Sequence, residues 1–305
     1  MSAASDFDAL VCADWSKYPE ARAAWVAFPK TREVRSLEPD PDWELGRLLA
    51  AASDLGGSGR VLVSVDAPIG VPGSFLAEAR RAFTLSSAAS FPDLLPVAAS
   101  TPSFFEPQTN PSEWSARRPF FRVAGGKRSL TVWIEAAAEQ GVTLWRRIEK
   151  TTGGKSVFAH GLPGHVAPAA RALWEEIAAI GSPAPFSLWP FECALDGDGC
   201  PLILAENYPR AAYGTALAET LPAPARLIGN KSSARVRRAI IDDLKRAAWI
   251  KLFGVTLNDL RLAEAADGNF DALLTVVALL RLVLEGRPLA ATPADSVSEG
   301  GMLCA

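Results

Sequence analysis

The chain has few of the residues that bind zinc in proteins. It contains two histidines and four cysteines in 305 residues. No two cysteines have the CxxC spacing that is typical of zinc sites, so a zinc site is not expected. Scattered cysteines of this kind are also typical of a reducing compartment, and we therefore expect a cytoplasmic protein.

Long apolar runs and an excess of charge are absent as well. No run reaches the roughly 20 residues of a membrane helix, and residues 1–8 lack the basic start and apolar centre of a signal peptide. We expect no membrane partner. The net charge of −3 and the pI near 5.6 do not indicate a protein that coats nucleic acid, although they allow an enzyme with a local basic groove.

Hydrophobic residues, at 49% of the chain, are plentiful, and several short apolar runs end in one acid. The run 9–13 is followed by Asp14, the run 61–65 by Asp66, and the run 202–205 by Glu206. Runs of this length predict buried strands, and ligands of open α/β sheets bind at the carboxyl ends of such strands. A fourth acid, Asp271, is expected in the first turn of an apolar helix over 270–284.

The order of these elements predicts a mixed α/β sheet. Residues 23–28 and 32–37 form two more expected strands, and the short turns between them favour an antiparallel meander with the first strand. An amphipathic helix with apolar residues from Leu45 to Ala52 precedes the strand 61–65, so this strand should lie parallel to the first. With 202–205, which we interpret as the return strand of a hairpin around 193–200, the sheet has five strands flanked by helices.

Residues 84–190 are predicted to form a large insertion that acts as a lid on the active-site face. Its first part, 84–130, shows no clear period and is expected to be a long ordered loop. A helix is predicted for 129–140, a hairpin for 144–160 with its turn at 151–154, and a second helix for 166–180. The loop is rich in arginine, and its Phe120 and Phe121 could stack on bases.

The four acids suit a site for divalent metal ions. Mg²⁺ and Mn²⁺ prefer oxygen ligands, and two such ions about 3.5–4 Å apart can activate water and stabilise the leaving oxygen of a phosphodiester. Each acid alone also has a structural explanation, since Asp14 and Asp66 could cap turns and Asp271 could stabilise a helix N-terminus. Their joint order along the chain favours the metal site.

That order resembles an uncharacterised family described as predicted RNase H-like nucleases. The resemblance is carried by Asp14 after the first strand, Asp66-Ala-Pro-Ile-Gly70, Glu206-Asn-Tyr-Pro-Arg210 and the late Asp271-Ala272, and it extends to Lys155-Ser-Val-Phe158, Trp189-Pro-Phe191 and Glu299-Gly-Gly-Met302. It implies one RNase H-like domain over 1–305. It also implies a nuclease with Mg²⁺ or Mn²⁺ bound by catalytic Asp14, Asp66, Glu206 and Asp271, and a DNA or RNA partner.

A more distant similarity is to Holliday-junction resolvases of the RuvC and YqgF type. These usually place an acid or a histidine three residues before the final Asp, whereas this chain has Gly268 there.

Four further residues are candidates for substrate binding: Lys155, Arg210, Lys231 and Trp15. Lys155 follows two glycines, but residue 149, where a phosphate-binding loop needs its first glycine, is Glu. Lys231 precedes an expected basic helix over 232–253, whose positive charge could attract a phosphate backbone or could be a solvated face.

Two alternatives to a nuclease follow from the same residues. One is a phosphotransferase or ATPase of the actin-like fold, which shares the sheet and uses an Asp after the first strand. The other is a non-catalytic module that binds nucleic acid or protein, in which the acids fix loop structure. The sequence indicates no oligomeric state.

Overall fold

The computed structural model describes residues 6–37, 43–124, 127–161, 164–196, 199–218, 231–290 and 296–304. The contacts within the chain divide it into two compact units. Unit 1 comprises Met1–Asp66, Pro185–Thr292 and Met302–Ala305, and unit 2 comprises Ala67–Ala184 and Pro293–Gly301. The predicted insertion falls largely in unit 2, which starts earlier than expected, directly after Asp66. Its role as a lid stays a prediction.

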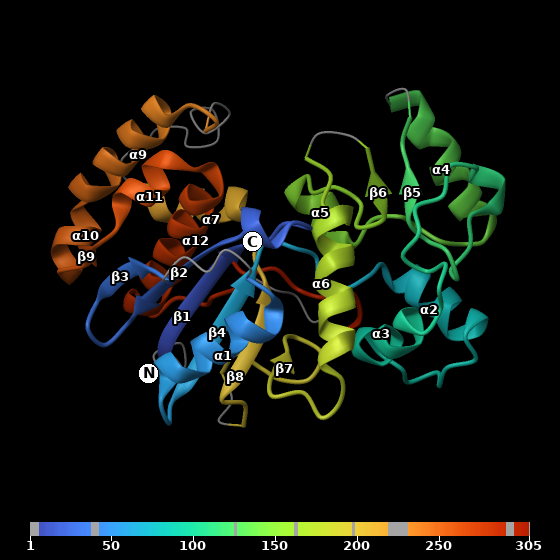
Figure 1. Cartoon of the computed structure of the whole chain (residues 1–305), viewed down its shortest axis with the longest axis horizontal. Coiled ribbons are helices and arrows are strands. Elements are labelled where there is room, and N and C mark those ends of the chain that lie inside the picture. Colours follow the sequence, from blue (N-terminus) through green and yellow to red (C-terminus); the bar gives the residue numbers. More distant parts are fainter. Residues whose placement is uncertain are drawn as a thin grey trace. The chain divides into compact units, whose positions relative to one another are not determined.

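Unit 1 is built on a mixed sheet of seven strands (Figure 1). In chain order these are β1 (Phe7–Asp14), β2 (Ala23–Phe28), β3 (Glu33–Ser36), β4 (Arg60–Val65), β7 (Ser187–Leu188), β8 (Leu202–Glu206) and β9 (Thr256–Leu257). Their order across the sheet is β7-β8-β4-β1-β2-β3-β9. The antiparallel pairs are β1–β2 and β2–β3, and the other pairs are parallel.

The predicted α/β class and the antiparallel first three strands are thereby confirmed, but the strand number of five is wrong. The two additional strands, β7 and β9, have two residues each and lie at the edges. A strand of two residues is too short to show an alternation of polar and apolar side chains, so the sequence does not predict it. The predicted hairpin around 193–200 is also wrong, because β8 lies between β4 and β7 and is parallel to both.

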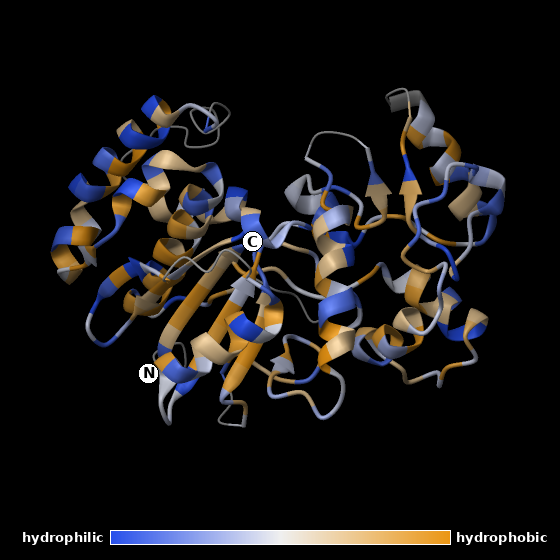
Figure 2. Cartoon of the chain, viewed as in Figure 1, coloured by the Kyte–Doolittle hydropathy of each residue, from blue (hydrophilic) through white to orange (hydrophobic). Residues whose placement is uncertain are grey.

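Helices cover both faces of this sheet. They are α1 (Leu45–Gly56), which packs on β1 and β4, and α7 (Pro209–Leu217), α9 (Ala234–Arg246), α10 (Ala248–Phe253), α11 (Leu260–Ala265) and α12 (Asp267–Leu284). The expected basic helix is thus two helices that break at Ala247. Figure 2 shows β1, β4 and β8 as largely hydrophobic, which fits strands covered on both sides.

Helix α12 is the central helix of unit 1. It contacts β1, β2 and α7, and every residue from Phe270 to Val283 is buried. It begins at Asp267, three residues before the expected start, so Asp271 lies in its second turn and not in its first. Gly268 and Asn269, both poor helix formers, hide this first turn in the sequence.

Unit 2 consists mainly of helices. These are α2 (Gly73–Ala82), α3 (Phe91–Ala99), α4 (Lys127–Glu139), α5 (Arg147–Thr152), α6 (Ala167–Ile180) and α13 (Ser296–Glu299), with a parallel pair of β5 (Phe121–Arg122) and β6 (Ala159–His160). The helices predicted for 129–140 and 166–180 are confirmed as α4 and α6. The prediction of a long loop over 84–130 is wrong, because α3 lies within this range. The hairpin over 144–160 is wrong because α5 forms there and ends at Gly153, which has the left-handed conformation of a helix cap.

The core of unit 2 is aromatic. Phe120 is fully buried and meets Phe104, Phe158 and Trp174 at ring distances of 5.6–6.1 Å. Phe121 stacks on Trp133 at 4.7 Å. Neither ring can stack on a base, so that prediction is wrong: the apolar character of the two residues serves the core.

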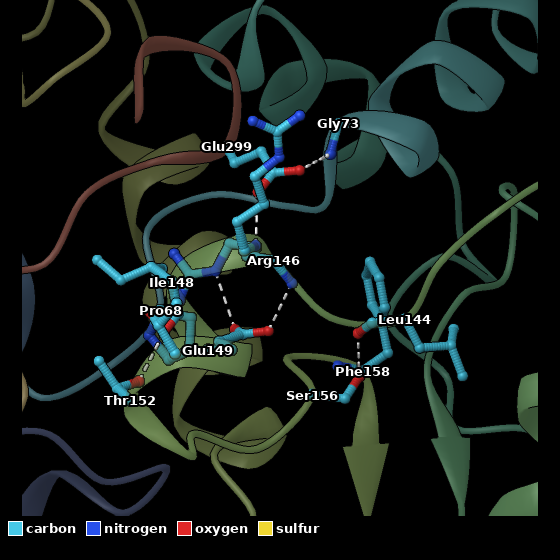
Figure 3. Close-up of polar contacts among 12 residues, drawn as sticks. Pro68, Gly73, Leu144, Arg146, Ile148, Glu149, Thr152, Ser156, Phe158 and Glu299 are labelled. Atoms are coloured by element: carbon cyan, nitrogen blue, oxygen red, sulfur yellow. Dashed lines mark hydrogen bonds and ion pairs between the residues drawn. The ribbon is translucent and has the colours of Figure 1, made fainter. Parts of the chain in front are cut away.

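The carboxylate of Glu299 connects α13 to two other helices of unit 2 (Figure 3). Glu299 accepts hydrogen bonds from the backbone N–H of Gly73 (2.8 Å) and of Arg147 (2.7 Å), at the starts of α2 and α5. A negative charge is favourable at a helix N-terminus. Beside it, Arg146 and Glu149 form a fully buried ion pair of 2.9 Å, in which the two charges compensate each other.

We predict that Leu279→Ala, in the buried centre of α12, lowers the free energy of unfolding by about 2–5 kcal/mol, because it leaves a cavity in the core. Leu252→Ala is the matched control. Leu252 is 78% exposed on α10, and its truncation should change stability by less than about 0.5 kcal/mol. Urea unfolding followed by circular dichroism measures both. Equal losses would contradict the placement of α12.

Candidate active site at the ends of β1 and β4

Asp14 and Asp66 lie side by side at the carboxyl ends of two adjacent parallel strands. The register pairs Cys12 with Ser64 and Ala13 with Val65. The backbone N–H of Asp66 then donates to the carbonyl of Ala13 (3.0 Å), which extends the pairing by one residue. Because side chains alternate along strands, both carboxylates point to the face of the sheet that α12 covers.

The first turn of α12 lies directly against Asp14. A Cβ atom added at Gly268 would come within 2.6 Å of Asp14 Oδ2, so glycine is what leaves room for this carboxylate. Any side chain at position 268 would require the Asp14 carboxylate to shift.

Asp271 follows one turn later in α12 and is only 4% exposed. Its Oδ1 accepts a hydrogen bond from the hydroxyl of Tyr213 in α7, and its Oδ2 accepts one from the ammonium of Lys231. Lys231 Nζ also lies 3.4 Å from the Tyr213 hydroxyl. Both oxygens of Asp271 are therefore engaged by donors of the protein. Sequence reasoning missed Tyr213, which resembles a core residue among the alanines of α7.

Arg237 fixes the backbone around Lys231. Its side chain is 4% exposed and donates to the carbonyls of Lys231 (2.7 Å), Glu264 (2.8 Å) and Ala265 (2.6 Å). Lys231 is thereby tied to the chain that leads into α12. Other cations of α9 form ion pairs with Glu264, Asp242 and Asp243. The basic helix is thus partly neutralised, which weakens the expectation of a broad basic surface.

The three carboxylates and the one ammonium influence each other's charge. Burial raises the pKa of Asp14 to about 7, and repulsion from Asp271 and Asp267 adds to the rise. Burial and repulsion from Asp14 and Asp271 raise the pKa of Asp66 well above its usual range. Burial alone would lower the pKa of Lys231, but attraction to the three carboxylates outweighs it and raises that pKa. The cluster has a surplus of negative charge that favours a further cation or protons.

The hydrogen bonding of Asp14 and Asp66 is incomplete. Among the residues that the structure describes, neither side chain forms a hydrogen bond, although both are half-buried. No three His, Cys, Asp or Glu side chains in the described ranges are grouped so as to hold a metal ion. Two carboxylates can suffice for Mg²⁺, which takes its other ligands from water and substrate phosphates. The pair Asp14 and Asp66 therefore fits a hard cation.

Glu206 does not lie level with Asp14 and Asp66 in the strand register. It lies beside Val65 in the register of β4 and β8, and therefore one residue short of Asp66. Alternation directs its side chain to the opposite face of the sheet. It still contributes to the raised pKa of Asp66, as the smallest of the causes.

The remaining candidates have different settings. Trp15 is 4% exposed, and the guanidinium of Arg22 covers its ring at 3.8 Å, so little of the ring is accessible to a substrate. Arg210 is exposed at the second position of α7, in the same unit as the carboxylates. Lys155 is exposed in unit 2, and its contact with phosphate stays a prediction.

Comparison of the chain with protein-family models, with curated proteins and with solved structures finds no match. In the described part of the chain, every helix falls short of the length or the apolar character needed to cross a membrane. The function must therefore be argued from the site itself.

The raised pKa of Asp14 predicts a pH-dependent stability. Between the usual carboxyl value of 3.8 and about 7, the folded state holds a proton that the unfolded state releases. Wild-type stability therefore falls across this window as pH rises. Asp14→Asn cannot titrate, so its stability relative to wild type should grow over the window, by up to about 4 kcal/mol, and level off above pH 7. Thermal unfolding in EDTA measures it, and a constant or shrinking difference would contradict the assignment.

Proposed function

We propose that the protein is a nuclease that uses Mg²⁺ or Mn²⁺ to hydrolyse phosphodiester bonds of nucleic acid. The observation that carries the proposal is the pair Asp14 and Asp66, which the parallel register brings together on one face without hydrogen bonds to described residues. Oxygen ligands of this kind suit a hard divalent cation.

The topology supports an RNase H-like fold for unit 1. The antiparallel meander β1-β2-β3, the helix α1 and the strand β4 parallel to β1 are the arrangement that this hypothesis expects, and β8 adds a further parallel strand. Both carboxylates lie at the carboxyl ends of adjacent parallel strands, where open α/β sheets bind ligands.

Asp14 and Asp66 are the metal ligands in this proposal. When bound, the cation would lower the pKa of a water molecule and neutralise charge on the phosphate. We leave Glu206 out of the ligand pair because the register directs it to the opposite face. Asp271 acts through Lys231, since both of its oxygens are engaged by protein donors.

Lys231 is the proposed phosphate contact. Its side chain is 35% exposed, and its ammonium is held by Asp271 and lies 3.4 Å from the Tyr213 hydroxyl. An ammonium fixed in this way stabilises the negative charge that develops during phosphodiester cleavage. Arg210, exposed at the start of α7, supplies a second cation for the backbone of the substrate, and Lys155 stays a candidate for a third.

Cleavage of single- and double-stranded DNA and RNA, with Mn²⁺ or with EDTA, tests the proposal. We expect Mn²⁺-dependent cleavage by the wild type and a loss of about 100-fold or more in Asp14→Asn and in Asp66→Asn, because each substitution removes a charged oxygen ligand. Asp54→Asn, on the exposed side of α1, is the matched control and should keep wild-type activity.

Equal cleavage by wild type and Asp14→Asn would indicate a contaminating nuclease and contradict the proposal. Metal-independent nucleotide binding without strand cleavage would favour the phosphotransferase alternative instead.

A further inference from the structure

The row formed by Asp14 and Asp66 continues onto β8, and the residue in step with them is Asn207. The register pairs Ser64 with Ala205 and Val65 with Glu206. The backbone N–H of Asn207 then donates to the carbonyl of Val65 (2.9 Å), just as that of Asp66 donates to Ala13. The three strands therefore end in one row of polar residues, in which Asn207 follows Asp66 on the face that α12 covers.

In the side-chain amide of Asn207, the nitrogen forms a hydrogen bond and the oxygen forms none with the described residues. Asn207 is only 2% exposed, and its Nδ2 donates to Ser64 Oγ at 3.0 Å. Its Oδ1 is buried and has no hydrogen-bond partner among the described residues.

The orientation of the amide follows from Ser64. The hydroxyl of Ser64 has two acceptors for its single proton, the carbonyl of Val11 (3.2 Å) and Cys12 Sγ (3.0 Å), and with the proton given to either one it accepts from the amide. This arrangement places Nδ2 toward Ser64 and leaves Oδ1 without a partner among the described residues.

A buried carbonyl oxygen without a hydrogen-bond partner lowers the stability of the folded state, and such a group calls for an explanation. Amide oxygens are ligands of hard cations in proteins, as carboxylates are. An acceptor aligned with two carboxylates that also lack hydrogen bonds is explained by a cation that all three oxygens share.

We propose that Asn207, through Oδ1, is the third oxygen ligand of the divalent cation held by Asp14 and Asp66, and that Ser64 positions it. The inference rests on the proposed function and replaces Glu206 by its neighbour at the end of β8. A neutral third ligand also adds no repulsion to a site in which two carboxylates already repel each other.

Titration of the full chain with Mn²⁺, followed by calorimetry or by electron paramagnetic resonance, tests this ligand without an activity assay. We expect Asn207→Ala to weaken Mn²⁺ binding about tenfold or more, in the range seen when groups that support a metal site are removed. Asn207→Asp keeps an oxygen at the same place and should bind Mn²⁺ at least as tightly as the wild type. Circular dichroism establishes that each variant is folded.

Glu206→Gln separates the two neighbours, and Asp14→Asn reports on the site as a whole. Weak binding by Asn207→Ala together with near-wild-type binding by Glu206→Gln supports the inference. Wild-type binding by Asn207→Ala, with binding lost in Asp14→Asn, overturns the role of Asn207 and leaves the metal site intact. A wild type that binds no Mn²⁺ overturns the proposed function itself.

Discussion

The parallel pairing of β1 with β4 is the constraint on which the site depends. It places two carboxylates next to each other at the end of a buried sheet, where repulsion and burial both raise the cost of their charge. Nothing in a strand register favours such a pair for stability alone. The arrangement is understandable if a cation or a proton compensates the charge. Carboxylates brought together in this way are typical of functional sites.

The surroundings of this pair show that part of the compensation is built into the protein. Asp271 holds the ammonium of Lys231, Tyr213 completes the hydrogen bonds of Asp271, and Arg237 fixes the backbone of Lys231 to the chain before α12. One fixed cation against three carboxylates still leaves negative charge in excess. Gly268 allows the first turn of α12 to approach Asp14 closely. The side chains of the site are thus held in place by the protein, while their negative charge is only partly compensated.

Much of this could be predicted from the sequence, because β1, β2 and β4 carry apolar runs and short turns connect β1, β2 and the weakly alternating β3. Asp14 and Asp66 followed from those strands. The edge strands β7 and β9 could not be predicted, since two residues carry no period, and the Gly-rich segment before β8 suggested a hairpin where a parallel pairing occurs. Local signals do not determine which strand becomes a neighbour.

The same limitation applies to individual residues of the site. Glu206 was predicted from its charge, yet a difference of one residue in register decides the face of the sheet, and that difference favours the uncharged Asn207. Tyr213 and Arg237 gave no signal, because an aromatic or a basic residue in an amphipathic helix has ordinary structural explanations. Their roles depend on packing between α7, α9 and α12.

The central claim is that Asp14 and Asp66 converge to share one cation. The most direct measurement is an anomalous difference map from crystals of the wild-type protein soaked in Mn²⁺. The account predicts a peak within bonding distance of a carboxylate oxygen of Asp14 and one of Asp66, on the side of the sheet covered by α12. Well-ordered Asp14 and Asp66 with no peak between them would contradict it.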